Sequence, residues 1–225
     1  MTTVKERTDE GSAWLVLFDF DGVVVNTESQ YSRFWHRVGT DYLGMDDLEF
    51  RVKGQTLVYI YDTFFRGRLA DQQAITAALD RFELTMDYEY VPGVLAFIEE
   101  LKRHGVKIAV VTSSNARKME AVYKAKPALK DLFDKVLTAE MFGRSKPHPD
   151  CFLKGMETFG VPACRTYVFE DSFNGLRAAR DSEATVIGLA TTNSPESIAP
   201  LCDAVIADFR GFTFGRMLET RRLRP

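Results

Sequence analysis

Side chains suited to ionic chemistry stand after short apolar runs at four separate places in the sequence. They are a pair of carboxylates, a hydroxyl, a lysine and a second pair of carboxylates: Asp19, Asp21, Thr112, Lys146, Glu170 and Asp171. Carboxylates held close together repel one another strongly unless a cation lies among them. Oxygen ligands with little nitrogen or sulfur nearby favour Mg²⁺ over Zn²⁺. If folding gathers the four places, these residue types predict a magnesium site.

The same residues are suited to chemistry on a phosphate ester. A carboxylate such as Asp19 or Asp21 is able to act as a nucleophile toward phosphorus and form an acyl phosphate. Lys146, the Thr112 hydroxyl and backbone N–H groups of residues 113–114 would then hold the phosphoryl oxygens. Such groups stabilise the negative charge of the transition state. The predicted chemistry is phosphoryl transfer to a carboxylate.

Apolar runs and helical patterns alternate along most of the chain. Continuous apolar runs of this length are typical of strands buried on both faces of a parallel sheet. The runs are Trp14–Phe18, Ile108–Val111, Val136–Leu137, Tyr167–Phe169, Thr185–Leu189 and Ala204–Ile206. Alternation of strands with helices places helices on both faces of the sheet. The expected fold class is α/β, with a Rossmann-like, mostly parallel sheet whose carboxyl-end edge collects the reactive side chains.

The segment from about Thr27 to Tyr88 breaks this alternation. It carries three amphipathic helical patterns with no predicted strand between them. The patterned residues are Tyr31, Phe34, Trp35 and Val38, then Leu57, Ile60, Tyr61 and Phe64, then Ile75, Ala78, Leu79 and Phe82. Successive amphipathic helices pack on each other as a small bundle. The predicted organisation is a Rossmann-like core of residues 1–27 and 89–225, with an inserted α-helical cap over residues 28–88.

Composition argues against several classes of function. A net charge of −3 and a pI near 5.7 give no overall attraction to nucleic acid or to an anionic membrane. No apolar run approaches the roughly 18–20 residues that span a bilayer, and residues 1–12 lack the apolar centre of a secretory signal. Cys151, Cys164 and Cys202 are odd in number and lack CxxC spacing. We therefore expect reduced thiols and a cytoplasmic protein that binds neither nucleic acid nor membrane.

The reactive residues belong to four motifs that occur in a fixed order. They are DFDGVVVNTE beginning at Asp19, then Thr112, then Lys146 within SKPHPD, and EDSFNG beginning at Glu170. In order and spacing, from Trp14 to about Ile206, the chain resembles the haloacid dehalogenase (HAD) superfamily. It is similar to the branch with a helical cap after the first strand, which includes β-phosphoglucomutase and phosphatase members. The resemblance implies a Mg²⁺-dependent phosphatase that acts on a small phosphorylated metabolite through an aspartyl-phosphate intermediate.

The resemblance also implies a role for each residue. Asp19 would attack phosphorus, and Asp21 would protonate the leaving alcohol and later activate water. Mg²⁺ would bridge Asp19 and the substrate, held also by the Asp21 backbone carbonyl, by Asp171 and by Glu170. The cap would close over the site and select substrates. Substrate contacts are expected from Ser113, Ser114 and Asn115 of the core and from Lys53, Gly54 and Gln55 of the cap loop.

Other activities of the family remain as alternatives. Dehalogenase and phosphonatase members lack the second aspartate of the first motif, so Asp21 argues against both. A sugar phosphomutase similar to β-phosphoglucomutase would carry a histidine at position 31 and an arginine at position 57, where this chain has Tyr31 and Leu57. This difference favours hydrolysis. A catalytically idle binding protein is a further alternative, although every reactive residue of the motifs is present.

Overall fold

A single parallel sheet forms the centre of the molecule. The computed structural model describes residues 13–221, and residues 1–12 and 222–225 lie outside this part. The prediction about a secretory signal concerns residues 1–12 and so lies outside the described residues. The strands are β1 Leu15–Phe18, β2 Lys107–Val111, β3 Lys135–Leu137, β4 Thr166–Glu170, β5 Thr185–Leu189 and β6 Ala204–Ile206. They lie in the order β3-β2-β1-β4-β5-β6, and every neighbouring pair is parallel. The predicted Rossmann-like α/β sheet is confirmed.

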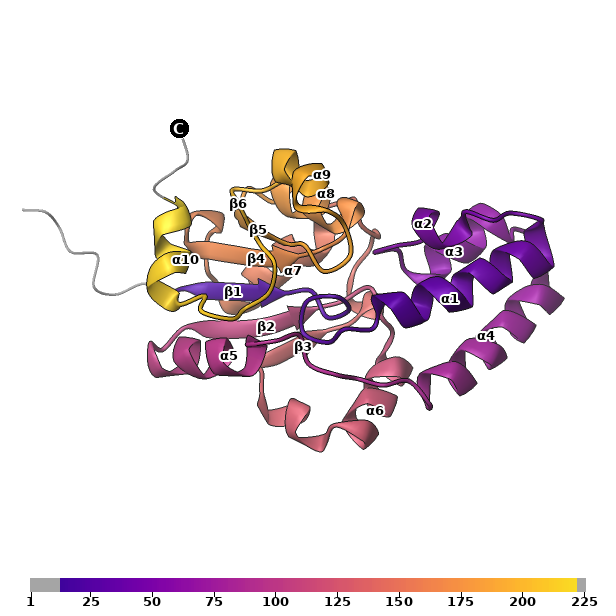
Figure 1. The fold of residues 1–225 in the computed structure, drawn as a ribbon, viewed down its shortest axis with the longest axis horizontal. Helices are drawn as coiled ribbons and strands as arrows, with labels where there is room; N and C mark the ends of the chain where they lie inside the picture. Colours follow the sequence, from indigo (N-terminus) through magenta and orange to yellow (C-terminus); the bar gives the residue numbers. More distant parts are fainter. Residues whose placement is uncertain (1–12, 222–225) are drawn as a thin grey trace, which may run out of the picture.

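Helices cover both faces of this sheet (Figure 1). Helices α5, α6 and α10 pack through buried apolar residues on one face, and α7, α8 and α9 on the other. Their bounds are α5 Val94–Arg103, α6 Ala116–Ala125, α7 Asp150–Phe159, α8 Phe173–Asp181, α9 Pro195–Ile198 and α10 Phe214–Arg221. The described part of the core also has four 3₁₀ segments: η2 Pro127–Asp131, η3 Ala139–Met141, η4 Ala163–Arg165 and η5 Ala199–Leu201. This layering leaves the ends of the strands free to carry a site.

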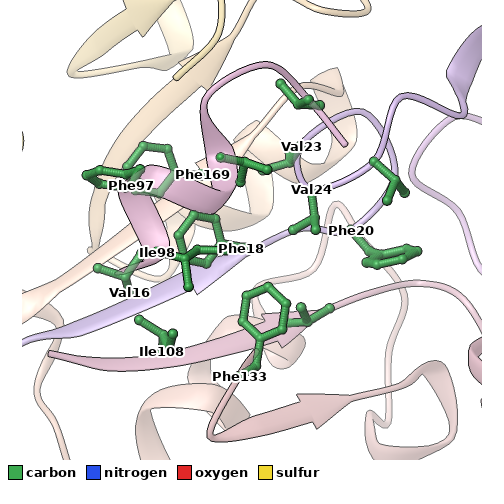
Figure 2. Packing of buried hydrophobic residues seen from close by; sticks show 14 of the residues in the cluster. Val16, Phe18, Phe20, Val23, Val24, Phe97, Ile98, Ile108, Phe133 and Phe169 are labelled. Carbon is green, nitrogen blue, oxygen red and sulfur yellow. The ribbon is translucent and has the colours of Figure 1, made fainter. Parts of the chain in front are cut away.

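The central strand β1 divides its side chains between the two hydrophobic layers. Val16 and Phe18 belong to one buried cluster, and Leu15 and Leu17 belong to the other. Successive side chains of a strand point to opposite faces, so an uninterrupted apolar sequence is needed where both faces are covered. Figure 2 shows Phe18 within an aromatic group, stacked on Phe169 with ring centroids 5.1 Å apart. This packing fixes the strand end that precedes Asp19.

The insertion between β1 and β2 is entirely helical and forms a separate lobe beside the sheet (Figure 1). Its elements are α1 Glu28–Val38, the π-helical segment η1 Gly39–Leu43, α2 Leu48–Arg51, α3 Leu57–Phe64 and α4 Leu69–Glu83. The three predicted helices are present, and α2 is an additional short one. The lobe has its own buried cluster, which includes Phe34, Trp35, Ile60, Ile75 and Leu79. Amphipathic helices that bury one face against each other explain this second core.

The two ends of the insertion lie side by side. Asn26 N–H donates to the Glu89 carbonyl over 2.8 Å, and Val25 forms an antiparallel bridge with Tyr90. Both connections between the core and the insertion therefore run next to each other, close to the proposed cap boundaries at residues 28 and 88.

Within residues 13–221, no helix is long and apolar enough to cross a membrane. Cys151, Cys164 and Cys202 are all free thiols.

Candidate active site

A cavity of about 700 Å³ lies between the cap and the carboxyl ends of the strands. The core contributes Asp19 and Asp21, which follow β1, and residues 112–115, which follow β2. The cap contributes residues from α1, α2, α3 and α4 and from the loop that contains Gly54. This volume falls in the range of about 300–1,000 Å³ that is typical of small-molecule sites.

Lys146 joins two carboxylates beneath this cavity. Its Nζ donates to Asp19 Oδ1 over 2.6 Å and to Glu170 Oε1 over 2.7 Å. The Lys146 side chain is 1% exposed, and Glu170 is fully buried. An ammonium group buried so completely is stable only when it is paired and hydrogen-bonded. The structure therefore brings together predicted residues of three motifs, although 127 positions of sequence separate Asp19 from Lys146.

The second carboxylate pair is held by the backbone that begins α8. Glu170 Oε2 accepts hydrogen bonds of 2.8 Å from the N–H groups of Asp171 and Ser172. Both Glu170 oxygens are therefore engaged, one by Lys146 and one by the chain. Asp171 is 1% exposed, and Thr192 donates a hydrogen bond to its carboxylate. Both carboxylates of the EDSFNG motif are thus buried at the start of α8.

Two glycines of the motifs are required by the close approach of these carboxylates. A Cβ at Gly22, where φ is +80°, would lie 2.1 Å from Asp171 Oδ2. A Cβ at Gly175 would lie 1.7 Å from Glu170 Oε1. Carbon and oxygen atoms do not approach so closely without bonding, so either side chain would displace a carboxylate.

Replacing Gly175 with alanine is expected to lower the free energy of unfolding by about 2–3 kcal/mol. Glu170 has no room to withdraw, because Lys146 and two backbone N–H groups hold it. Gly215 is the matched control: it is also helical, and a Cβ added there would lie 3.9 Å from its nearest neighbouring atom. Gly215→Ala should be neutral or stabilising by about 0.5 kcal/mol. Urea unfolding of both variants measures the difference, and equal stabilities would contradict the crowding at Gly175.

Asp21 stands apart from the buried carboxylates and faces the cap. Its carboxylate pairs with the Lys118 ammonium, accepts a hydrogen bond of 3.0 Å from Ser114 Oγ, and accepts another from Thr27 Oγ1. Lys118 Nζ also lies 4.4 Å from the centroid of the Tyr31 ring. The carboxylate of Asp21 is thus not one of the three buried carboxylates, those of Asp19, Glu170 and Asp171, that lie close together. The expected contact of the Asp21 backbone carbonyl with the metal stays a prediction.

The predicted substrate-contacting residues line the cavity, and most also have structural partners. Thr112 is buried and its hydroxyl accepts from Ser114 N–H over 3.0 Å. Asn115 caps α6 by accepting from Lys118 N–H over 2.8 Å. Ser113 Oγ donates to the Gly54 carbonyl over 2.8 Å. The structure gathers all of the proposed contacts at one cavity: Ser113, Ser114, Asn115, Lys53, Gly54 and Gln55.

The cap loop is bonded to the core by each of three motif loops. Besides the Ser113 bond, Asn174 Nδ2 donates to the Lys53 carbonyl over 3.0 Å, and Thr56 N–H donates to Ser145 Oγ over 3.1 Å. Ser145 Oγ also donates to Gln55 Oε1 over 3.2 Å. The cap loop therefore lies against the core and forms part of the cavity wall.

Lys118 and Thr192 are among the residues of the site that the sequence did not predict. Lys118 is a lysine next to Met119, the residue that marks the buried face of α6, and a lysine in this place is expected on the surface. In the structure Lys118 is only 3% exposed. Thr192 follows β5, a strand whose end contributed no predicted site residue. A signal was available for Thr192, because Thr191, Thr192 and Asn193 follow an apolar run as the other motifs do.

Burial dominates the protonation of the carboxylates. It raises the pKa of Asp19 to about 8, against the lowering effect of Lys146 and with further raising by Glu170. Burial and the nearby Glu170 raise the pKa of Asp171 well above its ordinary value. Burial would lower the pKa of Lys146, but Asp19 and Glu170 raise it well above its usual value. The buried group of Asp19, Lys146, Glu170 and Asp171 therefore holds one cation and more acidic groups than that cation neutralises.

The donor set fits a hard divalent cation. Asp19, Glu170 and Asp171 each offer a carboxylate oxygen, and these oxygens lie within 4.8 Å of one another. All three residues are buried, and oxygen donors of this kind are those that Mg²⁺ prefers. Three buried carboxyl groups with one lysine between them, together with the raised pKa values of Asp19 and Asp171, are the chemical reason to place a cation here.

Comparison with known sequences identifies the family of this chain. The family described as haloacid dehalogenase-like hydrolase matches residues 15–183, which is most of the chain. The match includes all four motifs and the helical insertion. The chain belongs to the haloacid dehalogenase-like hydrolase family, and the predicted resemblance is confirmed.

Two individual sequences and one solved structure are similar to this chain. "Protein SUPPRESSOR OF QUENCHING 1, chloroplastic" of Arabidopsis thaliana is 30% identical over 89% of this chain, which spans only 20% of that protein. Validoxylamine A 7'-phosphate phosphatase of Streptomyces hygroscopicus subsp. limoneus is 27% identical over 86% of this chain and 93% of its own length. A family IA, variant 3 HAD hydrolase of Entamoeba histolytica has the same fold, with a TM-score of 0.80, 22% identity, and coverage of 93% and 99% of the two chains. The expected class of enzyme, a hydrolase whose relatives are named as phosphatases, is confirmed.

Proposed function

We propose that this protein is a Mg²⁺-dependent phosphohydrolase that removes the phosphoryl group from a small phosphorylated metabolite through an aspartyl-phosphate on Asp19. The observation that carries the proposal is the buried arrangement of Lys146 between Asp19 and Glu170, beside Asp171 and at a cavity. Membership of a hydrolase family with phosphatase relatives supports the same reaction. A cytoplasmic location is part of this proposal.

The two aspartates of the first motif carry out the proposed chemical steps. The Asp19 carboxylate attacks phosphorus in line as the bond from phosphorus to the ester oxygen breaks, and Asp21, which must be protonated at this stage, gives its proton to that oxygen. Asp21 then takes a proton from water, whose oxygen attacks phosphorus. The bond between Asp19 and phosphorus breaks, inorganic phosphate leaves, and Asp19 is restored as a carboxylate. One aspartate therefore serves as nucleophile and the other as acid and base.

The remaining residues hold charge in place. Asp19, Asp171 and the Asp21 backbone carbonyl would hold Mg²⁺, which would supply positive charge to neutralise the phosphoryl group. Lys146 and the Thr112 hydroxyl bind the phosphoryl oxygens. Glu170 keeps Lys146 in position and stands close enough to contribute an oxygen to the metal. Lys118 and Thr27 hold the Asp21 carboxylate toward the cap side of the cavity.

Hydrolysis is favoured over phosphosugar isomerisation by two cap residues. Tyr31 donates its hydroxyl to Glu83 Oε1 over 2.8 Å, and Leu57 begins α3 and lines the cavity. Neither position carries the histidine or arginine expected of a mutase. The test is release of inorganic phosphate from a panel of phosphate esters, with Mg²⁺ and with excess chelator. Interconversion of sugar phosphate isomers without phosphate release would overturn the proposal in favour of a mutase.

Affinity for Mg²⁺ is expected to rise with pH between about 6 and 9. Burial raises the pKa of Asp19 to about 8 and that of Asp171 upward, so protons compete with the metal below these values. Isothermal titration in two buffers of different ionisation enthalpy should show proton release on binding at pH 7. A Kd that does not change with pH would contradict the raised pKa values.

The raised pKa of Asp19 also predicts how the stability of the metal-free protein changes with pH. Between the unfolded pKa of Asp19, near 3.8, and its folded pKa of about 8, the folded state binds more protons than the unfolded state. The free energy of unfolding therefore falls as pH rises through this window. Thermal unfolding with chelator should show a lower Tm at pH 8 than at pH 6, and Mg²⁺ should raise Tm more at the higher pH.

A further inference from the structure

The cap wall of the cavity contains a buried carboxylate that is only half satisfied. Glu49, in the first turn of α2, is 9% exposed and lines the cavity that contains Asp19. Its Oε1 lies 3.2 Å from His36 Nδ1. Its Oε2 is buried and, within residues 13–221, has no hydrogen-bond partner. A buried carboxylate oxygen left unpaired is costly, and such groups in folded proteins are nearly always satisfied. A bound molecule with a hydrogen-bond donor would satisfy it.

The charge of the cap residues that line the cavity, here called the cap wall, restricts the charge of the molecule that binds there. Glu28, Glu49, Asp62 and Glu83 of the cap all line the cavity, and among the described cap residues Lys53 is the one cation that lines it with them. Lys53 Nζ is itself 3.5 Å from Glu28 Oε2. A second phosphate or a carboxylate placed beside these residues would meet like charge with little compensation.

In the described part of the core, two cations line the cavity. Lys118 is paired with Asp21, and Arg144 is an exposed residue that lines the cavity from the loop before Lys146. Neither belongs to the cap wall around Glu49. The aromatic and aliphatic lining of that wall includes Tyr31, Trp35 and Val52, which offer faces for an uncharged or cationic group.

We propose that Glu49 determines specificity by accepting a hydrogen bond from a hydroxyl or ammonium group of the substrate, which carries one phosphate and no second anion. This inference rests on the proposed phosphohydrolase function and names its substrate class. The phosphate binds at Asp19 and Lys146, and the leaving group reaches into the cap. Hydroxyl and ammonium groups are both able to donate a hydrogen bond to Glu49, and the experiment below distinguishes them.

Steady-state kinetics on matched esters test the class of substrate. Phenyl phosphate is the reference, because its phenyl group has no hydrogen-bond donor. Glucose 6-phosphate supplies hydroxyl donors, glucosamine 6-phosphate adds an ammonium, and fructose 6-phosphate is compared with fructose 1,6-bisphosphate. We expect kcat/KM for the best donor-bearing monophosphate to exceed that for phenyl phosphate by at least about tenfold. Fructose 1,6-bisphosphate should be the poorer member of its pair.

The variant Glu49→Gln tests the residue itself. It keeps the shape of the side chain and one acceptor oxygen but removes the charge. The ratio of kcat/KM for the donor-bearing ester to that for phenyl phosphate should fall about 10- to 100-fold for an ammonium donor and less for a hydroxyl donor. Asp71→Asn is the matched control: Asp71 lies in the cap, pairs with Arg68 and does not line the cavity, so the ratio should not change. Glu49→Ala should lower the ratio for both donors, and thermal unfolding checks that each variant is folded.

The outcomes separate this inference from the function on which it rests. If phenyl phosphate is hydrolysed with Mg²⁺ but Glu49→Gln leaves the ratio unchanged, the role of Glu49 is overturned and the phosphohydrolase stands. Preference for the bisphosphate over fructose 6-phosphate would overturn the single-anion class. If folded protein hydrolyses none of the esters, both proposals fall together.

Discussion

Replacing Asp19 with asparagine is expected to lower Mg²⁺-dependent phosphate release by about 10⁴- to 10⁶-fold, on the scale seen when a nucleophile is removed. An amide has nearly the same shape as the carboxylate but is a poor nucleophile and a poorer metal ligand. Because Asp19 also carries one oxygen of the acidic cluster, Mg²⁺ affinity should fall as well. Phosphate release at saturating Mg²⁺ separates the loss of the nucleophile from the loss of the metal.

A covalent readout makes this prediction specific to the proposed role of Asp19. Wild-type protein quenched in acid during turnover should show a phosphorylated species by intact mass, and Asp19→Asn should not. Asp71→Asn, a cap substitution outside the cavity, should keep both the activity and the phosphorylated species. Phosphorylation that persists in Asp19→Asn would move the nucleophile elsewhere.

Replacing Lys146 with methionine is expected to impair both stability and turnover. The substitution leaves Asp19 and Glu170 buried side by side without their shared cation. Removing one partner of a buried ion pair typically costs about 3–5 kcal/mol of unfolding free energy. The loss should be larger at pH 8 than at pH 5, because protonation relieves the repulsion at the lower pH. We expect kcat to fall by about 10³-fold, because the phosphoryl oxygens lose a charged donor.

Lys154→Met provides the matched control for this effect. Lys154 lies on α7, is about half exposed, and pairs with Glu157 three residues later. Surface pairs of this kind contribute about 0–1 kcal/mol, so its unfolding free energy and kcat should stay near those of wild type. Urea unfolding in chelator at the two pH values, together with Mg²⁺-dependent kinetics, measures both variants. A Lys146→Met protein as stable and active as Lys154→Met would refute the buried bridge.

The sheet and its reactive edge were predictable because local sequence determines them. A strand covered on both faces must be continuously apolar, and the run ending at Phe18 is the clearest case. Since parallel strands share a carboxyl-end edge, the residues after each run were expected to meet, and Lys146 does bridge Asp19 and Glu170. Assigning the roles of these residues required the family resemblance in addition.

The missed parts depend on contacts between distant segments. Lys118 reaches Asp21 across 97 positions of sequence, and its place in α6 gives no sign of burial. Helix α2 has four residues, which is too short for a 3.6-residue period to be detected, so Glu49 could not be assigned to the cavity wall. The boundaries of the cap at residues 28 and 88 remain predictions.

The bonds between the cap loop and the core bear on how such an enzyme changes its substrate over evolutionary time. Ser113, Ser145 and Asn174 each bond to a main-chain atom of residues 53–56. Main-chain atoms are present whatever the side chain, so substitutions at Lys53 retain these anchor points. The side chain at position 53 is therefore able to change while the main chain of the loop keeps its bonds to the core. A library of substitutions at this position is a natural starting point for redirecting the enzyme to new esters.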